Sequence, residues 1–246
     1  MCSNCETTQD HAGLGRRQFF GLGAAAAAVF ATGMARADEC LPFTADLQAA
    51  TTPDQAFQML MDGNARFAAG TSLHCDLLAQ AEATAAKQTP FACVLACIDS
   101  REAPELILDQ QIGDIFVVRV AGNVPTPEII GSFEYATKVA GAKAILVVGH
   151  NHCGAIKGAV DKAVVGDNLT TLLNEIEPAI TATPLTGERS SKNGAFVQAV
   201  AETNVRLGVV ALLEKSPLLK SMVDAGQLKI VGGVYDLETH VVTLLA

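Results

Sequence analysis

The sequence predicts an α/β fold, in which one domain has a mostly parallel central sheet flanked by helices. Short, almost wholly apolar runs typical of buried parallel strands alternate with segments of helical periodicity. About 209 residues follow position 37, which is enough for one sizeable core. No Pro/Ser-rich linker or internal repeat divides them. Strands that alternate with helices predict a parallel sheet covered on its faces.

The expected elements begin with a helix at Thr52 and Pro53, a capping residue and a proline suited to the first turn. This helix runs to about Ala69, before Gly70. Further along, residues 126–128 begin a second helix, which Gly141 ends. The other expected elements are strands over 91–98, 115–120 and 144–149, a short helix from Gly154, helices over 172–180 and 195–215, and a final strand pair over 228–235 and 240–245, whose second member is a candidate antiparallel edge strand.

Groups that can bind a metal follow two of these strands directly. Cys97 lies at the end of the run 91–98, and His150 and Cys153 follow the run 144–149. Ligands gather at the carboxyl ends of parallel strands, so groups far apart in sequence can converge there. Two thiolates and one imidazole form the ligand set of a zinc site with one position left for a reacting water. The alternative is that both cysteines are ordinary core residues.

A carboxylate and a guanidinium lie beside the first cysteine. Asp99 and Arg101 are two positions apart in a segment expected to be extended, so both side chains face the same side and can form a bidentate pair. Next to a candidate ligand, such a pair indicates catalysis. The alternative is a simple salt bridge that contributes little stability.

These residues resemble the pattern C-x-D-S-R followed by H-x-x-C of the β-class carbonic anhydrases. The likeness covers nearly everything after about residue 50. The motif residues are Cys97, Asp99, Ser100, Arg101, His150 and Cys153, and the resemblance extends to 62–67, 113–119, 121–123, 229–232 and 235–237.

The resemblance implies a single domain of β-carbonic anhydrase type over 38–246 and a zinc-dependent lyase. Zinc-bound hydroxide would convert CO₂ reversibly to bicarbonate and a proton, with Cys97, His150 and Cys153 as the ligands. Asp99 would orient the hydroxide, and Arg101 would hold Asp99 away from the metal. In some members the aspartate takes the fourth zinc position, so Asp99 is a candidate for both roles.

Two thiolates offset the charge of zinc, so activity is expected to rise towards alkaline pH. Two other functions are open. One is hydrolysis of a CO₂ isostere, carbonyl sulfide or carbon disulfide, on the same fold. The other is a noncatalytic zinc-binding module.

Three positions match the substrate pocket of the plant-like subgroup by their spacing from the motifs, namely Gln88, Phe116 and Tyr135. An amide, a ring and a phenol suit a small, mostly apolar substrate that becomes an anion. Each also has a structural alternative, since Phe116 and Tyr135 could be packed aromatics and Gln88 could lie in an exposed turn. The bicarbonate-regulated subgroup is marked by a tryptophan, and this chain has none. The resemblance also implies a homodimer or a multiple of dimers, with pockets at the subunit interface.

The first 37 residues are interpreted as a twin-arginine signal peptide. Arg16-Arg17-Gln18-Phe19-Phe20 is the signature, residues 21–33 carry no charge, and Ala35-Arg36-Ala37 is a cleavage site before Asp38. The alternative is a membrane anchor, but the apolar stretch of about 15 residues is shorter than the roughly 20 that a spanning helix needs. We therefore expect a periplasmic protein with no stable membrane anchor after cleavage.

The net charge limits the partners that are expected, and the remaining cysteines and His152 each have an expected role. A net charge of −9 and a pI of about 5.0 argue against nucleic acid or anionic membranes as partners. Cys93 is expected to pack as a small hydrophobe. An oxidising periplasm would permit a disulfide between Cys40 and Cys75, although the sequence leaves their separation open. His152 is expected to face solvent or support a ligand, with proton transfer as the alternative.

Overall fold

The computed structural model describes residues 40–184 and 187–245, so the predicted signal peptide over 1–37 lies outside the described residues. In the described part, a five-stranded sheet has the order β2-β1-β3-β4-β5. All neighbouring strands are parallel except β4 and β5, which are antiparallel. The predicted sheet, with its antiparallel edge strand, is confirmed. The strands are β1 (Ala92–Ala96), β2 (Ile115–Arg119), β3 (Ala144–His150), β4 (Lys229–Tyr235) and β5 (Val242–Leu245).

Helices connect and cover the strands. They are α1 (Ala45–Ala50), α2 (Pro53–Ala68), α3 (Leu77–Thr84), α4 (Pro104–Ile107), α5 (Pro127–Glu134), α6 (Gly154–Val160), α7 (Asp167–Asn174), α8 (Glu177–Ala182), α9 (Gly194–Lys215) and α10 (Pro217–Asp224). A 3₁₀ turn, η2 (Ala121–Asn123), follows β2, and a π-helix, η3 (Tyr135–Val139), continues α5.

The predicted helix over 172–180 is not one continuous helix in the structure. The segment 172–180 is divided between α7 and α8, with a break around Glu175 and Ile176. Pro178 lies in the first turn of α8. Proline has no backbone N–H to donate and its ring disfavours helical geometry in the preceding turn, so it starts a new helix more readily than it continues one.

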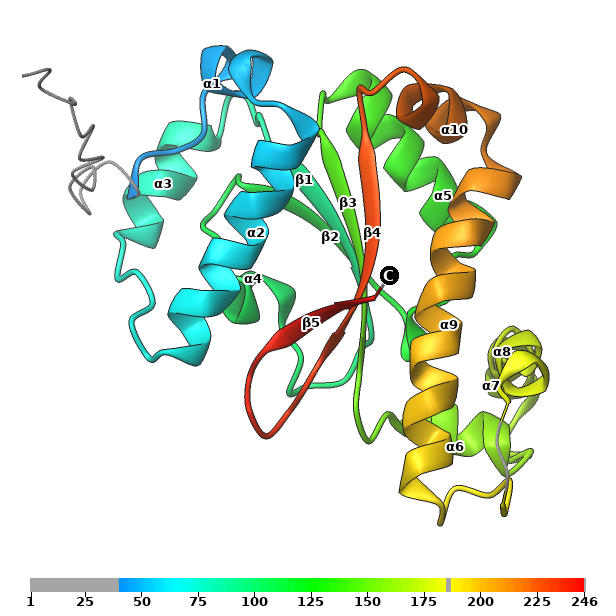
Figure 1. Cartoon of the computed structure of the whole chain (residues 1–246). Coiled ribbons are helices and arrows are strands. Elements are labelled where there is room, and N and C mark those ends of the chain that lie inside the picture. Colours follow the sequence, from blue (N-terminus) through cyan, green and yellow to red (C-terminus); the bar gives the residue numbers. More distant parts are fainter. Residues whose placement is uncertain (1–39, 185–186, 246) are drawn as a thin grey trace, which may run out of the picture. The chain divides into compact units, whose positions relative to one another are not determined.

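Helices cover both faces of the sheet (Figure 1). On one face, Phe57 and Leu60 of α2 and Ile107 of α4 form a buried cluster with alternate residues of β1 and β3. On the other face, α5, α9 and α10 supply the buried apolar side chains. Side chains of β1 and β3 that point in opposite directions are thus buried on both faces, which explains their continuous apolar runs.

Helix α9 packs closely on the sheet because two glycines face it. A Cβ at Gly149 or Gly232 would lie 2.8 or 2.6 Å from a methyl of Val205. Among the described residues, α9 is the one helix long and apolar enough to suit a membrane span. Its side chains Val205 and Leu212 are fully buried beside the sheet, so α9 is a helix of the domain core.

Cys40 and Cys75 form a disulfide with a Cα–Cα distance of 5.4 Å, which answers the question that the sequence leaves open. The bond joins residues 35 positions apart. Closing a loop of this length restricts the unfolded chain and stabilises the fold by about 3–4 kcal/mol in the chain-entropy account. Cys93 is a fully buried free thiol in the core, as predicted.

Candidate metal centre

Two thiols and an imidazole meet at the carboxyl ends of β1 and β3. The strands are parallel neighbours, with Leu95 opposite Val147, so Cys97 and His150 follow at the same carboxyl-terminal edge of the sheet. Cys153 joins them after a turn. All three residues are buried, their ligand atoms lie within 4.8 Å of one another, and the two Sγ atoms are 3.9 Å apart. We call these three residues the ligand cluster.

The imidazole of the ligand cluster is prepared for metal binding. His150 Nδ1 lies 2.8 Å from the carbonyl oxygen of Asn151, and a carbonyl can only accept, so Nδ1 carries the proton. Nε2 then offers a lone pair, yet it is buried without a hydrogen-bond partner among the described residues. A buried acceptor without a partner is costly unless another group takes its lone pair. A metal ion held by Nε2 and the two sulfurs satisfies it, and this donor set fits zinc.

The surroundings favour a thiolate at Cys97. The hydrogen bond from the Cys153 thiol holds the pKa of Cys97 well below its usual value, and the N–H of Gly122 contributes by donating to Cys97 Sγ at 3.4 Å. The shared proton correspondingly raises the pKa of Cys153. Gly122 has a φ of 75°, which glycine adopts at little cost, and its carbonyl accepts from Asn204 Nδ2 at 2.8 Å. The thiolate is the form that binds zinc.

Asp99 and Arg101 form a bidentate ion pair next to the ligand cluster. Nε and Nη2 of Arg101 donate to Oδ1 and Oδ2 of Asp99 at 2.9 and 2.8 Å. These hydrogen bonds hold the pKa of the Asp99 carboxyl well below its usual range. Asp99 Oδ2 lies 3.8 Å from His150 Nε2. The carboxylate therefore lies at the rim of the ligand cluster with both oxygens engaged by Arg101.

The expectation of an extended segment here is wrong. The backbone N–H of Arg101 donates to Asp99 Oδ1 at 3.0 Å, and that of Glu102 donates to the Asp99 carbonyl at 3.0 Å. The pair therefore lies in a tight turn, in which an aspartate side chain bonds to the backbone two residues on. The two side chains meet because of this turn. The sequence instead predicts that they meet because alternate residues of an extended strand face the same side.

Two residues that the sequence did not mark as site residues hold this turn in place. Glu102 is fully buried, accepts the N–H of Cys97 at 3.2 Å, and has a pKa raised by burial to about 8. Arg119, at the end of β2, donates to the carbonyls of Cys97 and Asp99 at 2.8 and 2.6 Å. Arg119 lies near the end of the predicted strand 115–120, and this position could have marked it as a residue near the site. Nothing in the sequence separates Glu102 from an exposed acid.

His152 points away from the ligand cluster. Its Nε2 lies 3.2 Å from Glu238 Oε1, and more than half of each side chain is exposed. Its φ of 57° turns the chain between the two ligands on either side of it. The residue faces solvent, which is the arrangement that the sequence favoured.

The three pocket candidates are not gathered around the ligand cluster within one chain. Phe116 and Tyr135 lie edge to face, with ring centroids 6.4 Å apart, and border a cavity of about 500 Å³ between β2 and α5. Gln88 borders a separate cavity of about 390 Å³. Phe116 is opposite Cys93 in the sheet, roughly 13 Å along the strand from Cys97.

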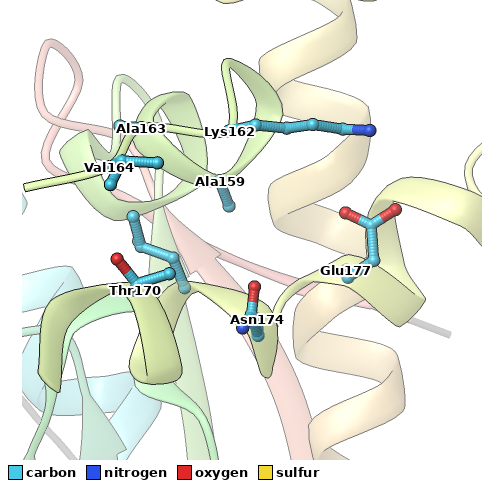
Figure 2. A pocket seen from close by; sticks show the side chains of 8 residues that line it. Ala159, Lys162, Ala163, Val164, Thr170, Asn174 and Glu177 are labelled. Atoms are coloured by element: carbon cyan, nitrogen blue, oxygen red, sulfur yellow. The ribbon is translucent and has the colours of Figure 1, made fainter. Parts of the chain in front are cut away.

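A further cavity of about 360 Å³ lies between α6 and α7 (Figure 2). Lys162, Thr170, Asn174 and Glu177 supply its polar groups. Its lining includes no member of the ligand cluster. This cavity is therefore separate from the candidate metal centre.

Comparisons with known proteins agree with this geometry. A family model described as carbonic anhydrase matches residues 92–242. Carbonic anhydrase 2 of Mycobacterium tuberculosis is 35% identical over 193 residues, which cover 76% of this chain and 90% of that protein. The carbonic anhydrase of Mycolicibacterium smegmatis is 35% identical over 188 residues, with the same coverage.

Solved structures show the same fold. Coccomyxa β-carbonic anhydrase, in complex with acetazolamide, is 27% identical with a TM-score of 0.60, over 67% of this chain and 75% of that chain. A tetrameric β-carbonic anhydrase of Sordaria macrospora is 25% identical with a TM-score of 0.57, over 77% of this chain and 96% of that chain. The chain belongs to the β-carbonic anhydrase family.

Proposed function

We propose that this protein is a zinc-dependent carbonic anhydrase that interconverts CO₂ and water with bicarbonate and a proton. The observation that carries the proposal is the buried ligand cluster, in which His150 Nε2 lies beside two sulfurs and has no hydrogen-bond partner in the described part of the chain. Cys97, His150 and Cys153 would hold zinc through two Sγ atoms and Nε2, with one coordination position left open. When bound, zinc supplies Lewis acidity, which makes water a nucleophile near neutral pH.

Asp99 orients the reacting water, and Arg101 positions Asp99. An ionised carboxylate only accepts hydrogen bonds, so Asp99 fixes the direction of a water O–H beside the ligand cluster. Arg101 engages both carboxylate oxygens and keeps them from binding the metal in this conformation. If Arg101 were removed, the freed carboxylate could occupy the position that a reactant needs. Asp99 is thus both a catalytic group and a conditional ligand.

The pocket is completed by a second subunit. β2 is an edge strand with half-buried residues. The apolar side chains of Ile98, Tyr135 and Val139 are 60%, 53% and 71% exposed. Tyr135 packs against Phe116 of β2, and Val139 ends the π-helix that Tyr135 begins. Such an edge is a template for pairing with another chain. Two-fold symmetry pairs β2 with its copy in antiparallel orientation. That pairing brings Phe116 of one subunit towards the strand end that carries Cys97 in the other.

This arrangement supports a homodimer of the plant-like subgroup, or a multiple of such dimers. Phe116, on the edge strand β2, and Tyr135 already lie together, at a position where a partner subunit can contact them. An apolar pocket with few polar groups suits CO₂, which has no charge until it becomes bicarbonate.

We also propose that the chain is exported through the twin-arginine signal over 1–37 and acts in the periplasm as residues 38–246. The Cys40 to Cys75 disulfide supports this proposal because disulfides persist in oxidising compartments. Cys40 lies just after the expected cleavage site between Ala37 and Asp38, so the bond ties the start of the mature chain to the domain.

Replacement of one sulfur ligand tests the metal site. Cys97→Ser should lose zinc, because a hydroxyl is a poor substitute for a thiolate ligand, and CO₂ hydration should fall with it. Cys93→Ser is the matched control, because Cys93 is an equally buried thiol outside the ligand cluster. Metal analysis and stopped-flow hydration measure both properties. Wild-type zinc content in Cys97→Ser would contradict the assignment.

Arg101→Ala tests catalysis separately from metal binding. Zinc content should stay at one per chain, while hydration should fall by about 10- to 100-fold because Asp99 is no longer held. Lys220→Ala, which breaks an exposed ion pair with Asp224, is the control and should change neither. Zinc binding without hydration in the wild type would support a noncatalytic module. Turnover of carbonyl sulfide or carbon disulfide alone would support the isostere hydrolase.

Val139→Glu tests the proposed interface. A charge at this exposed apolar position, at the end of the π-helix that Tyr135 begins, should shift the protein towards monomers and lower hydration in parallel, because each pocket needs its partner. Val164→Glu is the control, since Val164 is 87% exposed between α6 and α7. Light scattering after size exclusion gives the oligomeric state. An unchanged oligomer with unchanged activity would place the interface elsewhere.

The export proposal is tested by replacing both Arg16 and Arg17 with lysine. Because the twin-arginine pair is the recognised feature, the variant should accumulate as an uncleaved precursor in the cytoplasm. The wild-type chain should appear in the periplasmic fraction with an intact mass that starts at Asp38. A variant exported as well as the wild type would rule out this route.

A further inference from the structure

Residues 40–51, which we call the N-terminal clamp, connect two segments that carry pocket candidates. The amide Nε2 of Gln48 donates to the carbonyl of Pro90 at 2.7 Å and to that of Ala140 at 2.8 Å. Pro90 is two residues after Gln88. Ala140 caps the π-helix that begins with Tyr135, with its N–H bonded to the Tyr135 carbonyl. One side chain thus joins the two segments.

Gln48 is held at this position by two hydrogen bonds and by close packing against Gly141. A primary amide has two N–H donors, and both are used here. Gly141, with a φ of 86°, lies against the same amide, and a Cβ there would come within 2.9 Å of Gln48 Oε1. Both bonded carbonyls lie just outside regular elements, where backbone groups need partners from side chains.

The contacts that keep the N-terminal clamp on the domain, which include a hydrogen bond from the Thr89 hydroxyl to the Phe43 carbonyl, are concentrated near its ends. Its helix α1 has six residues and buries none of them, so it is too short and too exposed to be stable alone. Cys40 is tied to Cys75, and its carbonyl accepts from Gln80 Nε2 at 2.9 Å. The Phe43 ring lies 5.1 Å from the Phe91 ring. The disulfide is the covalent member of this set.

We propose that the N-terminal clamp is a redox-dependent positioning device for the substrate pocket, with the Cys40 to Cys75 disulfide as its lock and Gln48 as its positioning residue. The proposal rests on the proposed function, because Gln88 and Tyr135 matter here as pocket residues. A dithiol reductant opens the lock: the S–S bond takes up two electrons and two protons to give two thiols, and the dithiol becomes a disulfide. The released clamp loosens the pocket segments and leaves the ligand cluster intact.

The test compares Gln48→Ala, Gln48→Glu and the double variant Cys40→Ser/Cys75→Ser with the wild type. Gln48→Glu keeps the side-chain size but removes both donors, so it should behave like Gln48→Ala. All three should raise KM for CO₂ by about 3- to 10-fold, with kcat within about twofold and zinc at one per chain. Gln58→Ala, which removes an exposed bond to Asp62 on α2, should match the wild type.

Reduction of the wild type with dithiothreitol should reproduce the KM of the double serine variant, and the same treatment should leave that variant unchanged. The unresponsive variant also controls for any effect of the reductant on zinc. An unchanged KM in the Gln48 variants, or a loss of zinc and kcat together with KM, would overturn the proposal.

Hydrogen exchange separates this proposal from the proposed function. Reduction should speed amide exchange in peptides over 86–91 and 135–141, and leave the peptide over 92–97 unaffected. This result would support the clamp even if the protein hydrated no CO₂. Equal exchange in oxidised and reduced protein would overturn the clamp even if hydration were normal.

Discussion

The parallel pairing of β1 with β3 is the constraint on which the metal centre depends. It aligns the carboxyl ends of two strands that are far apart in sequence, so that Cys97 and His150, 53 positions apart, meet at one edge of the sheet. Burial on both faces makes the register of these strands rigid, because a slip would place wrong side chains in two cores at once. Packing of the sheet therefore sets where the two strand ends meet, and hydrogen bonds that join Cys97 to Gly122, Glu102 and Arg119 position the first sulfur there.

Much of this arrangement can be predicted from the sequence because the buried strands are continuous apolar runs. Apolar runs that end directly at Cys97 and His150 identify both the strands and the edge where their ends meet. Thr52 as a capping residue and Pro53 in the first turn similarly mark the start of α2. Each of these features depends on residues that are close together in the chain, so it can be recognised in a single sequence.

What could not be predicted depends on tertiary contacts. The burial of Glu102 follows from a turn whose shape is set by hydrogen bonds to Asp99 and by Arg119 from the neighbouring strand. The closeness of Cys40 and Cys75 is a contact between segments 35 positions apart, which the bond from Gln80 Nε2 to the Cys40 carbonyl supports. The pocket candidates could be selected by their spacing, but their distance from the ligand cluster within one chain appears only in three dimensions.

The charges around the centre are arranged so that little net charge is buried. Two thiolates offset a divalent metal, and Asp99 is offset by Arg101 at the rim, where the pair is partly exposed. Glu102 lies next to those thiolates, and burial raises its pKa to about 8, although His150 and Arg119 partly offset this effect. One carboxyl oxygen accepts the Cys97 N–H, which a carboxyl can do in either protonation state, so Glu102 holds the turn whether or not it is charged.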